Sequence, residues 1–173
     1  MKTVKKSKKL AIRNLLHYSL FIIHCSLFIV LFVSCTEQLR YPVEPYIEFV
    51  SFEKIGDSIG IDNEGILTIY YTDGDGDLGN LDPKDSTTNY FIIYQEKQHG
   101  VYVTSEETEF SASLPYFLSP DKKQSIDGTI QRRLIINNPY SDFDTIRFEC
   151  WLEDRANHKS NRIFTPEIVV KKK

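Results

Sequence analysis

Short apolar runs in which every second residue is hydrophobic recur through residues 46–173, and this alternation restricts that part of the chain to β-structure. In residues 146–152, for example, Ile146, Phe148 and Leu152 fall on one face of an extended chain. No segment of the region has the period of an amphipathic helix. We therefore predict strands at residues 46–52, 65–72, 90–96, 101–104, 129–137, 145–153 and 162–170.

Clusters of Gly, Asn, Asp and Pro separate these runs, and such residues tolerate the backbone angles of tight turns. The clusters occupy residues 62–65, 73–76, 99–100, 127–128 and 137–139. Seven or so antiparallel strands in about 130 residues predict an all-β sandwich of two sheets. Residues 105–123 fit no pattern well, and an eighth strand at residues 110–114 is an alternative.

The first 34 residues have the layout of a secretory signal. They contain six basic residues and no acidic residue, and an almost unbroken apolar stretch follows at residues 15–33. Leu31, Ser34 and Cys35 resemble the cleavage site of bacterial lipoprotein signals, which implies diacylglycerol on the cysteine. We therefore predict a lipoprotein signal peptide at residues 1–34, a lipidated tether at residues 35–45 and a folded domain at residues 46–173.

The apolar stretch admits a second interpretation, because about 19 apolar residues can span a hydrocarbon core of roughly 30 Å. His17 and His24 disfavour an uncleaved transmembrane helix. The stretch is also a tandem copy, in which residues 24–30 echo residues 17–23. Its length is therefore compatible with a duplication inside an ordinary signal.

Removal of the signal changes the charge of the protein. The whole chain has 21 basic and 24 acidic residues, and loss of the six N-terminal basic residues leaves 15 against 24, a net charge of about −9. Such an acidic exterior argues against nucleic acid as a partner and against electrostatic docking onto anionic lipid. The lipid on Cys35 must then hold the protein on the membrane.

Cysteine usage leaves no intrachain disulfide in the processed chain. Cys25 leaves with the signal and Cys35 is acylated, so Cys150 is the remaining thiol. Alternation places Cys150 on the same strand face as Phe148 and Leu152. We interpret it as a small core residue rather than a nucleophile, which would need a partly exposed and electropositive setting.

Two motifs resemble those of a known group of proteins. They are Tyr-Thr-Asp-Gly-Asp-Gly-Asp-Leu-Gly at residues 71–79 and Trp-Leu-Glu-Asp-Arg-Ala-Asn-His-Lys-Ser-Asn at residues 151–161. Both are similar to segments of Bacteroidota lipoproteins with an immunoglobulin-like domain, although the second motif lacks the glycine that is usual between Ala156 and Asn157. The resemblance implies an immunoglobulin-like sandwich attached to the outer membrane, at its periplasmic face or at the cell surface. It implies no activity.

Asp73, Asp75 and Asp77 stand at alternate positions in the first motif and suggest a calcium site, because calcium takes about six to eight hard oxygen ligands. In an extended strand such side chains lie about 6.6 Å apart, so the loop must curl if they are to share an ion. The loop is not an EF-hand, because Leu78 and Lys84 occupy the positions of the required glycine and glutamate. A plain solvated turn is the alternative, and the sequence does not decide between the two.

Strand order brings a second segment into the calcium hypothesis. In immunoglobulin order, the loop after Asp73 and the loop at residues 154–161 lie at the same end of the sandwich. Asp154 and the amide oxygen of Asn157 are therefore further candidate ligands. The alternative for Asp154 is an ion pair with Arg155 or a local turn.

Signals for catalysis are weak. Outside the signal the histidines are His99 and His158, and the sequence contains no zinc-protease, serine-hydrolase or phosphate-loop motif. We expect no enzymatic activity, and we expect His158 to be a solvated loop residue rather than a metal ligand. Two functions of different class remain: a structural or protein-interaction module that binds another envelope protein, and a glycan-binding module suggested by Trp151, Tyr140 and Phe143.

The tether predicts an orientation for the domain. Residues 36–44 separate Cys35 from the first strand, which gives a reach of at most about 30 Å. In immunoglobulin order the first strand begins at the end that carries the acidic loop, so this loop should face the membrane, with Glu44 near it. The partner-facing surface is then expected at the opposite end, at residues 54–64, 95–100 and 138–144.

Overall fold

The computed structural model describes residue 21, residues 40–118 and residues 123–172 of the chain. A compact unit extends over Leu39–Lys173, and its described part contains eight strands. They are β1 (Tyr46–Gly56), β2 (Asp62–Asp73), β3 (Tyr90–Gln98), β4 (Val101–Glu109), β5 (Ile126–Ile135), β6 (Thr145–Leu152), β7 (Ile163–Phe164) and β8 (Ile168–Val169). Neighbouring strands pair in antiparallel fashion.

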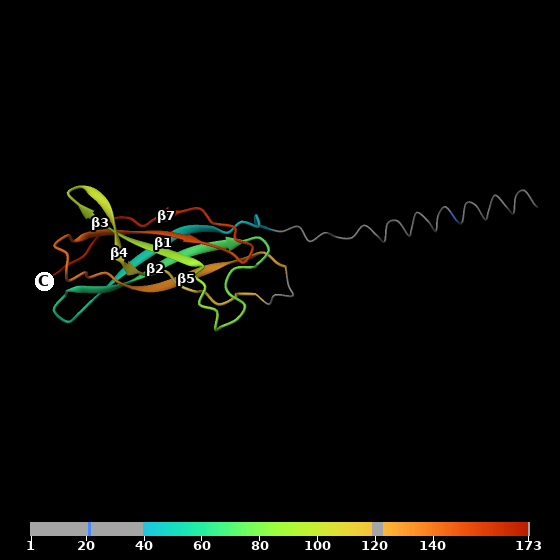
Figure 1. The fold of residues 1–173 in the computed structure, drawn as a ribbon, viewed down its shortest axis with the longest axis horizontal. Coiled ribbons are helices and arrows are strands. Elements are labelled where there is room, and N and C mark those ends of the chain that lie inside the picture. Colours follow the sequence, from blue (N-terminus) through green and yellow to red (C-terminus); the bar gives the residue numbers. More distant parts are fainter. Residues whose placement is uncertain (1–20, 22–39, 119–122, 173) are drawn as a thin grey trace, which may run out of the picture. The chain divides into compact units, whose positions relative to one another are not determined.

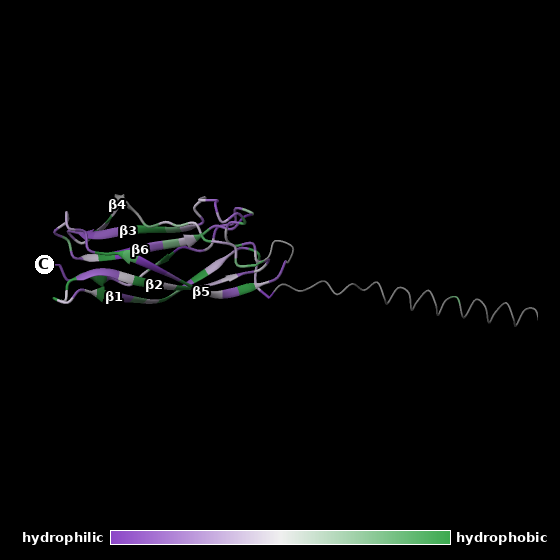
Figure 2. Ribbon diagram, turned by 90° about the horizontal axis from the view of Figure 1, so that it is seen from below, coloured by the Kyte–Doolittle hydropathy of each residue, from purple (hydrophilic) through white to green (hydrophobic). Residues whose placement is uncertain are grey.

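The strands form two sheets (Figure 1). One sheet has the order β1-β2-β5, and the other has the order β4-β3-β6-β7, with β8 also paired to β6. Figure 2 shows the two layers, with β3, β4 and β6 in one and β1, β2 and β5 in the other. These orders correspond to strands A-B-E and C′-C-F-G of an immunoglobulin-like domain. The predicted all-β sandwich is confirmed.

Alternation of side chains explains how the two sheets share one core. Along β6 every second residue is buried, and Ile146, Phe148, Cys150 and Leu152 have no exposed surface. The largest other contributions come from β2 and β3, through Leu67, Ile69, Tyr90, Ile92 and Tyr94. Because each large apolar side chain contributes about 1.5–3 kcal/mol when fully buried, this core is the main source of stability.

The last predicted strand, at residues 162–170, is split into β7 and β8. Pro166 lies between the two pieces and has no N–H to donate to the sheet. The neighbouring Thr165 side chain takes over part of the pairing, because its hydroxyl accepts a hydrogen bond from the Phe148 N–H at 3.0 Å. A hydrogen bond to the side chain of Thr165 therefore joins this segment to β6 between β7 and β8.

The other strands lie in the predicted order, with ends that differ by a few residues. The main difference is β4, which extends to Glu109 rather than ending at residue 104. The alternative strand at residues 110–114 is reduced to an isolated bridge between Ala112 and Tyr90.

The acidic loop and the start of β1 lie at one end of the sandwich, as predicted. Tyr46, the first residue of β1, pairs with Thr72 near the end of β2. The loop after β6 reaches the same end, where the Arg155 N–H lies 3.4 Å from the carbonyl oxygen of Asp77 and donates to it. We call this end, with residues 40–45, 74–81 and 154–158, the root end. The β1–β2, β3–β4 and β5–β6 connections lie at the opposite end, which we call the far end.

The predicted signal at residues 1–34 and the lipidation site Cys35 lie outside the described residues. Within the part of the chain that the structure describes, no helix is sufficiently long and apolar to cross a bilayer.

Candidate metal site

The acidic loop begins at the last residue of β2 and is closed by its own first carboxylate. Asp73 ends β2, and its Oδ2 atom accepts a hydrogen bond from the Leu78 N–H at 3.1 Å. Gly76 and Gly79 have φ values of 72° and 84°, in the left-handed region that glycine adopts without strain. These two residues give the chain the curl that a shared ion requires.

Neighbouring segments pack against the loop and fix its shape. A Cβ atom at Gly74 would collide with the carbonyl oxygen of Pro42, so the tether runs directly over this residue. The Gly74 carbonyl accepts a hydrogen bond from the Ser125 hydroxyl at 2.8 Å, and Leu78 has no exposed surface. The loop is therefore a packed part of the root end, with Asp73 buried and Asp75 and Asp77 partly exposed.

The curl brings three carboxylates together. Asp73, Asp75 and Asp77 each place one oxygen within 4.8 Å of the oxygens of the other two. The Oδ1 atom of each is buried and has no hydrogen-bond partner, and Asp73 as a whole has no exposed surface. An unpaired buried charge costs on the order of several kcal/mol, and a cation bound among the three carboxylates would offset that cost.

Basic side chains do not supply that cation. Among the described residues, no lysine, arginine or histidine forms an ion pair with the three aspartates. Arg155 is close, but its guanidinium donates to the carbonyl oxygens of Leu78 and Gly79 at 3.2 and 2.8 Å. Arg155 thus braces the backbone of the loop and forms no hydrogen bond to the three Oδ1 atoms.

The pKa values reflect this crowding. Burial raises the pKa of Asp73 to about 6, and the charges of Asp77 and Asp75 add to the shift. Burial, followed by the charge of Asp154, also raises the pKa of Asp77. Both shifts show that burial and mutual repulsion oppose ionisation of Asp73 and Asp77.

Asp154 lies near the cluster, but its carboxylate already has partners. It is buried, and its two oxygens contact the backbone N–H and the ring Nδ1 of His158 at 2.8 and 2.9 Å. The hydrogen bond to Asp154, together with the charge of this residue, raises the pKa of His158. Asn157 is exposed in a left-handed turn with φ of 67°. The carboxylates that converge are therefore those of the three predicted ligands in the first motif. The carboxylate of Asp154 instead binds the backbone N–H and the ring of His158.

Glu44 is exposed and is not part of the converging group. Its charge instead contributes to the raised pKa of His158.

The outer face of the larger sheet carries aromatic side chains that stack on their neighbours. The rings of Phe91 and Trp151 lie 4.8 Å apart with 3° between their planes, and the guanidinium of Arg162 lies 4.1 Å from the Trp151 ring centroid. Arg147 lies 3.7 Å from the ring centroid of Tyr102 in the same way. These rings are partly buried, and each has a neighbouring side chain stacked on it.

Cys150 is a core residue, as predicted. It has no exposed surface, and burial raises the pKa of its thiol to about 12. A thiol in this state is not a nucleophile at neutral pH.

Glu96 forms a buried polar cluster at the far end that the sequence analysis missed. Its carboxylate accepts hydrogen bonds from the Tyr94 hydroxyl (2.9 Å), the Ser141 hydroxyl (2.8 Å) and the Asn138 amide (3.2 Å). Burial alone would raise the pKa of Glu96, but these hydrogen bonds outweigh it and hold the pKa below its usual value. Alternation along β3 places position 96 on the core face, and a charged residue there is the signal that was overlooked.

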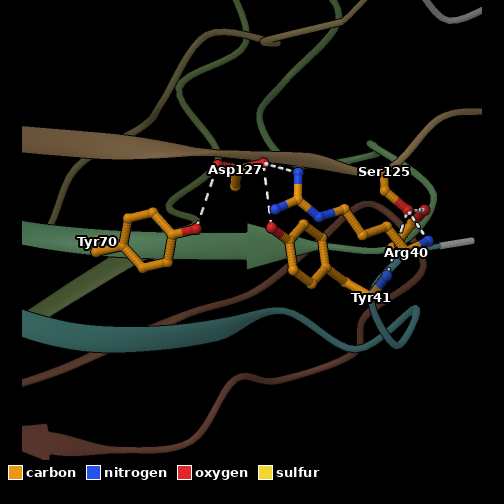
Figure 3. Close-up of polar contacts among 6 residues, drawn as sticks. Arg40, Tyr41, Tyr70, Ser125 and Asp127 are labelled. Carbon is orange, nitrogen blue, oxygen red and sulfur yellow. Dashed lines mark hydrogen bonds and ion pairs between the residues drawn. The ribbon is translucent and has the colours of Figure 1, made fainter.

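A clamp between the tether and β5 was also missed (Figure 3). The backbone N–H groups of Arg40 and Tyr41 both donate to the Ser125 hydroxyl, at 2.8 and 3.4 Å. The hydroxyls of Tyr41 and Tyr70 donate to the Asp127 carboxylate at 3.3 and 3.2 Å, and the Arg40 guanidinium lies 3.7 Å from it. These partners are separated by up to 86 positions in the chain, so no local motif indicates them.

Comparison with known proteins assigns no family. A scan against protein-family models found no match, and a search of curated proteins found no similar sequence. The interpretation of the root end therefore depends on its own geometry.

Proposed function

We propose that this protein is a non-catalytic module of the cell envelope, anchored to the outer membrane through lipid on Cys35 and stabilised by calcium at its root end. The observation that carries the calcium proposal is the convergence of three buried Oδ1 atoms without partners, from Asp73, Asp75 and Asp77. A divalent cation would satisfy all three at once and would offset their mutual repulsion.

The chemistry of the donors favours calcium over other cations. The converging atoms are carboxylate oxygens, and no sulfur or imidazole nitrogen belongs to the group, which disfavours zinc and copper. Calcium accepts irregular sets of about six to eight oxygens, whereas magnesium demands near-octahedral geometry. Asp75 and Asp77 are only partly buried, so water can complete the coordination.

Calorimetric titration of the purified domain tests the metal proposal. We expect calcium to bind with 1:1 stoichiometry after treatment with a chelator, and magnesium to bind more weakly. Asp75→Asn should abolish the calcium signal, whereas Asp142→Asn, which changes an exposed acid at the far end, should leave it intact. Equal binding by both variants would place the ion elsewhere.

The anchor is tested separately by fractionation of cells that express the full chain. Cys35→Ser should move the protein out of the membrane fraction, because the tether then lacks its lipid. Cys25→Ser is the matched control, since this cysteine belongs to the segment that the signal peptidase removes. Retention of the Cys35→Ser protein in the membrane at the level of the control would contradict lipidation at this residue.

Two features support a structural or protein-interaction role for the domain. The far end presents Tyr140, which is 95% exposed, on a loop that Glu96 holds through Ser141 and Asn138. A rigid exposed aromatic of this kind suits contact with another envelope protein. The glycan-binding alternative has less support, because the ring of Trp151 is covered by stacking partners.

A further inference from the structure

Three large apolar side chains are exposed together at the root end. Leu81, Tyr116 and Phe117 are 44%, 44% and 40% exposed. Their two segments run side by side, because Asn80 N–H donates to the Leu114 carbonyl at 2.8 Å and Tyr116 N–H donates to the Asn80 carbonyl at 3.1 Å. We call Leu81, Tyr116 and Phe117 the root patch.

The root patch is held outward by the structure beneath it. The ring of Phe117 stacks on Tyr71, a buried core residue, with 5.2 Å between ring centroids. Gly79 packs directly under the backbone of Pro115, where a Cβ atom would collide with the Pro115 carbonyl. Because Pro115 precedes Tyr116 in the chain, this contact joins the patch to the acidic loop.

The tether leaves the domain at the same end. Arg40 and Tyr41 are fixed to Ser125 and Asp127 (Figure 3). The Ser125 hydroxyl also donates to the Gly74 carbonyl of the acidic loop. Only five residue steps then separate Arg40 from Cys35, a distance of at most about 18 Å even when fully extended. The clamp therefore shortens the reach of the tether well below the 30 Å that its sequence length suggests.

From this placement we infer that the root patch is a membrane-contact surface, which seats the domain on the lipid bilayer that holds the Cys35 anchor. The inference rests on the proposed lipidation, because the short tether is what brings this end to the bilayer. Aromatic side chains favour the headgroup region of a bilayer, where the apolar ring is buried and the polar edge stays hydrated. The contact is apolar rather than electrostatic, in keeping with the acidic charge of the domain, and calcium on the adjacent loop would reduce its repulsion from anionic headgroups.

The two most exposed large apolar side chains of the folded domain do not share this placement. Tyr140 and Ile59 are strongly exposed, but they lie on far-end connections, beyond the reach of a tether that is fixed at the root. Tyr140 therefore provides an internal control, because it is an exposed aromatic of the same chemistry as Tyr116.

Hydroxyl-radical footprinting of the full lipidated protein tests the surface. The protein is reconstituted in vesicles of phosphatidylethanolamine and phosphatidylglycerol and is compared with the same protein after proteolytic release from the anchor. We expect oxidation of Tyr116 and Phe117 to fall several-fold on the vesicles, with oxidation of Tyr140 unchanged. Equal oxidation of the root patch in both states, or protection of Tyr140 instead, would overturn the inference.

A second measurement separates the failure of this surface from the failure of the anchor. The domain without its first 35 residues contains both sheets and the whole core, so it can be sedimented with the same vesicles in the presence of calcium. We expect weak association, reduced roughly tenfold by the double variant Tyr116→Ser/Phe117→Ser and unchanged by Tyr140→Ser. This result would support the surface even if mass spectrometry found no lipid on Cys35. Equal association of the double variant and the parent domain, or burial of the patch by self-association in solution, would refute it.

Discussion

The sharpest prediction concerns Asp73→Asn, a substitution that preserves size and removes one charge from the acidic loop. The amide oxygen of asparagine can still accept the hydrogen bond from the Leu78 N–H, so the closure of the loop is retained. The amide N–H₂ group can donate to the orphan oxygens of Asp75 and Asp77. The substitution should therefore imitate part of what a cation does.

The expected magnitude follows from the pKa of Asp73. In the metal-free protein this pKa is about 6, chiefly because of burial, against about 3.9 in an unfolded chain. The raised value means that ionisation opposes folding: the penalty is absent below about pH 3.9 and is complete above about pH 6. Two units correspond to about 3 kcal/mol, which is an upper value for the gain in the free energy of unfolding of the variant.

Thermal unfolding in EDTA and in calcium measures the effect. At pH 7.5 in EDTA the variant should melt above the parent protein, by at most roughly 10 °C, and the difference should vanish near pH 4. A site with a Kd of about 10⁻⁴ M would stabilise the parent by about 1.4 kcal/mol in 1 mM calcium, and the variant should gain nothing. Asp142→Asn at the far end should match the parent in every condition.

Two results would refute this reasoning. If Asp73→Asn were less stable than the parent in EDTA at pH 7.5, the carboxylate would be making a favourable interaction in the apo state. If calcium raised the melting temperature of the variant as much as that of the parent, the ion would bind elsewhere.

Three further predictions concern the packing around the site and the core. Glu96→Gln should lower the free energy of unfolding by about 1–3 kcal/mol at neutral pH. Because the pKa of Glu96 is held below its usual value, the stability that its carboxylate contributes is present above about pH 4.3 and is lost on acidification. Denaturant titrations of the variant and the parent protein should therefore converge below about pH 4. Gly74→Ala should displace Pro42 and make the tether more sensitive to protease. Gly100→Ala is the control, because a Cβ atom at Gly100 would contact no neighbouring atom. It should lower the free energy of unfolding by only roughly 1 kcal/mol, because of the positive φ, and leave digestion of the tether unchanged. Cys150 should react with a thiol reagent only after denaturation, and rapid reaction of the folded domain would contradict its burial.

Hydrophobic alternation was sufficient to predict the sandwich from the sequence. The buried face of β6 and the inward position of Cys150 follow directly from a period of two residues. The split of the last strand was visible in principle, because Pro166 stood inside the predicted segment. The C-terminal end of β4 could not be predicted, since residues 105–109 show no alternation of apolar side chains.

The candidate site was predictable only in part. The spacing of Asp73, Asp75 and Asp77 indicated the ligands and the need for a curl, and strand order placed Asp154 at the same end. Sequence gave no means of knowing that both oxygens of Asp154 bind His158, because that depends on the conformation of a single turn.

The contacts that join distant segments were invisible in the sequence. Asp127 binds Tyr41 and Tyr70 across the sheet, and Ser125 links the tether to the acidic loop. Such side-chain hydrogen bonds leave no periodic pattern, so the short effective tether emerged only from the structure.

The central claim is that a calcium ion sits among the three carboxylates of the root end. A crystal structure of the calcium-saturated domain tests it most directly, because the ion and its bonds are observed rather than inferred from stability. We predict an ion within about 2.3–2.6 Å of an oxygen from each of Asp73, Asp75 and Asp77. A structure in millimolar calcium that shows these three oxygens bound only to water, with no ion between them, would contradict the account.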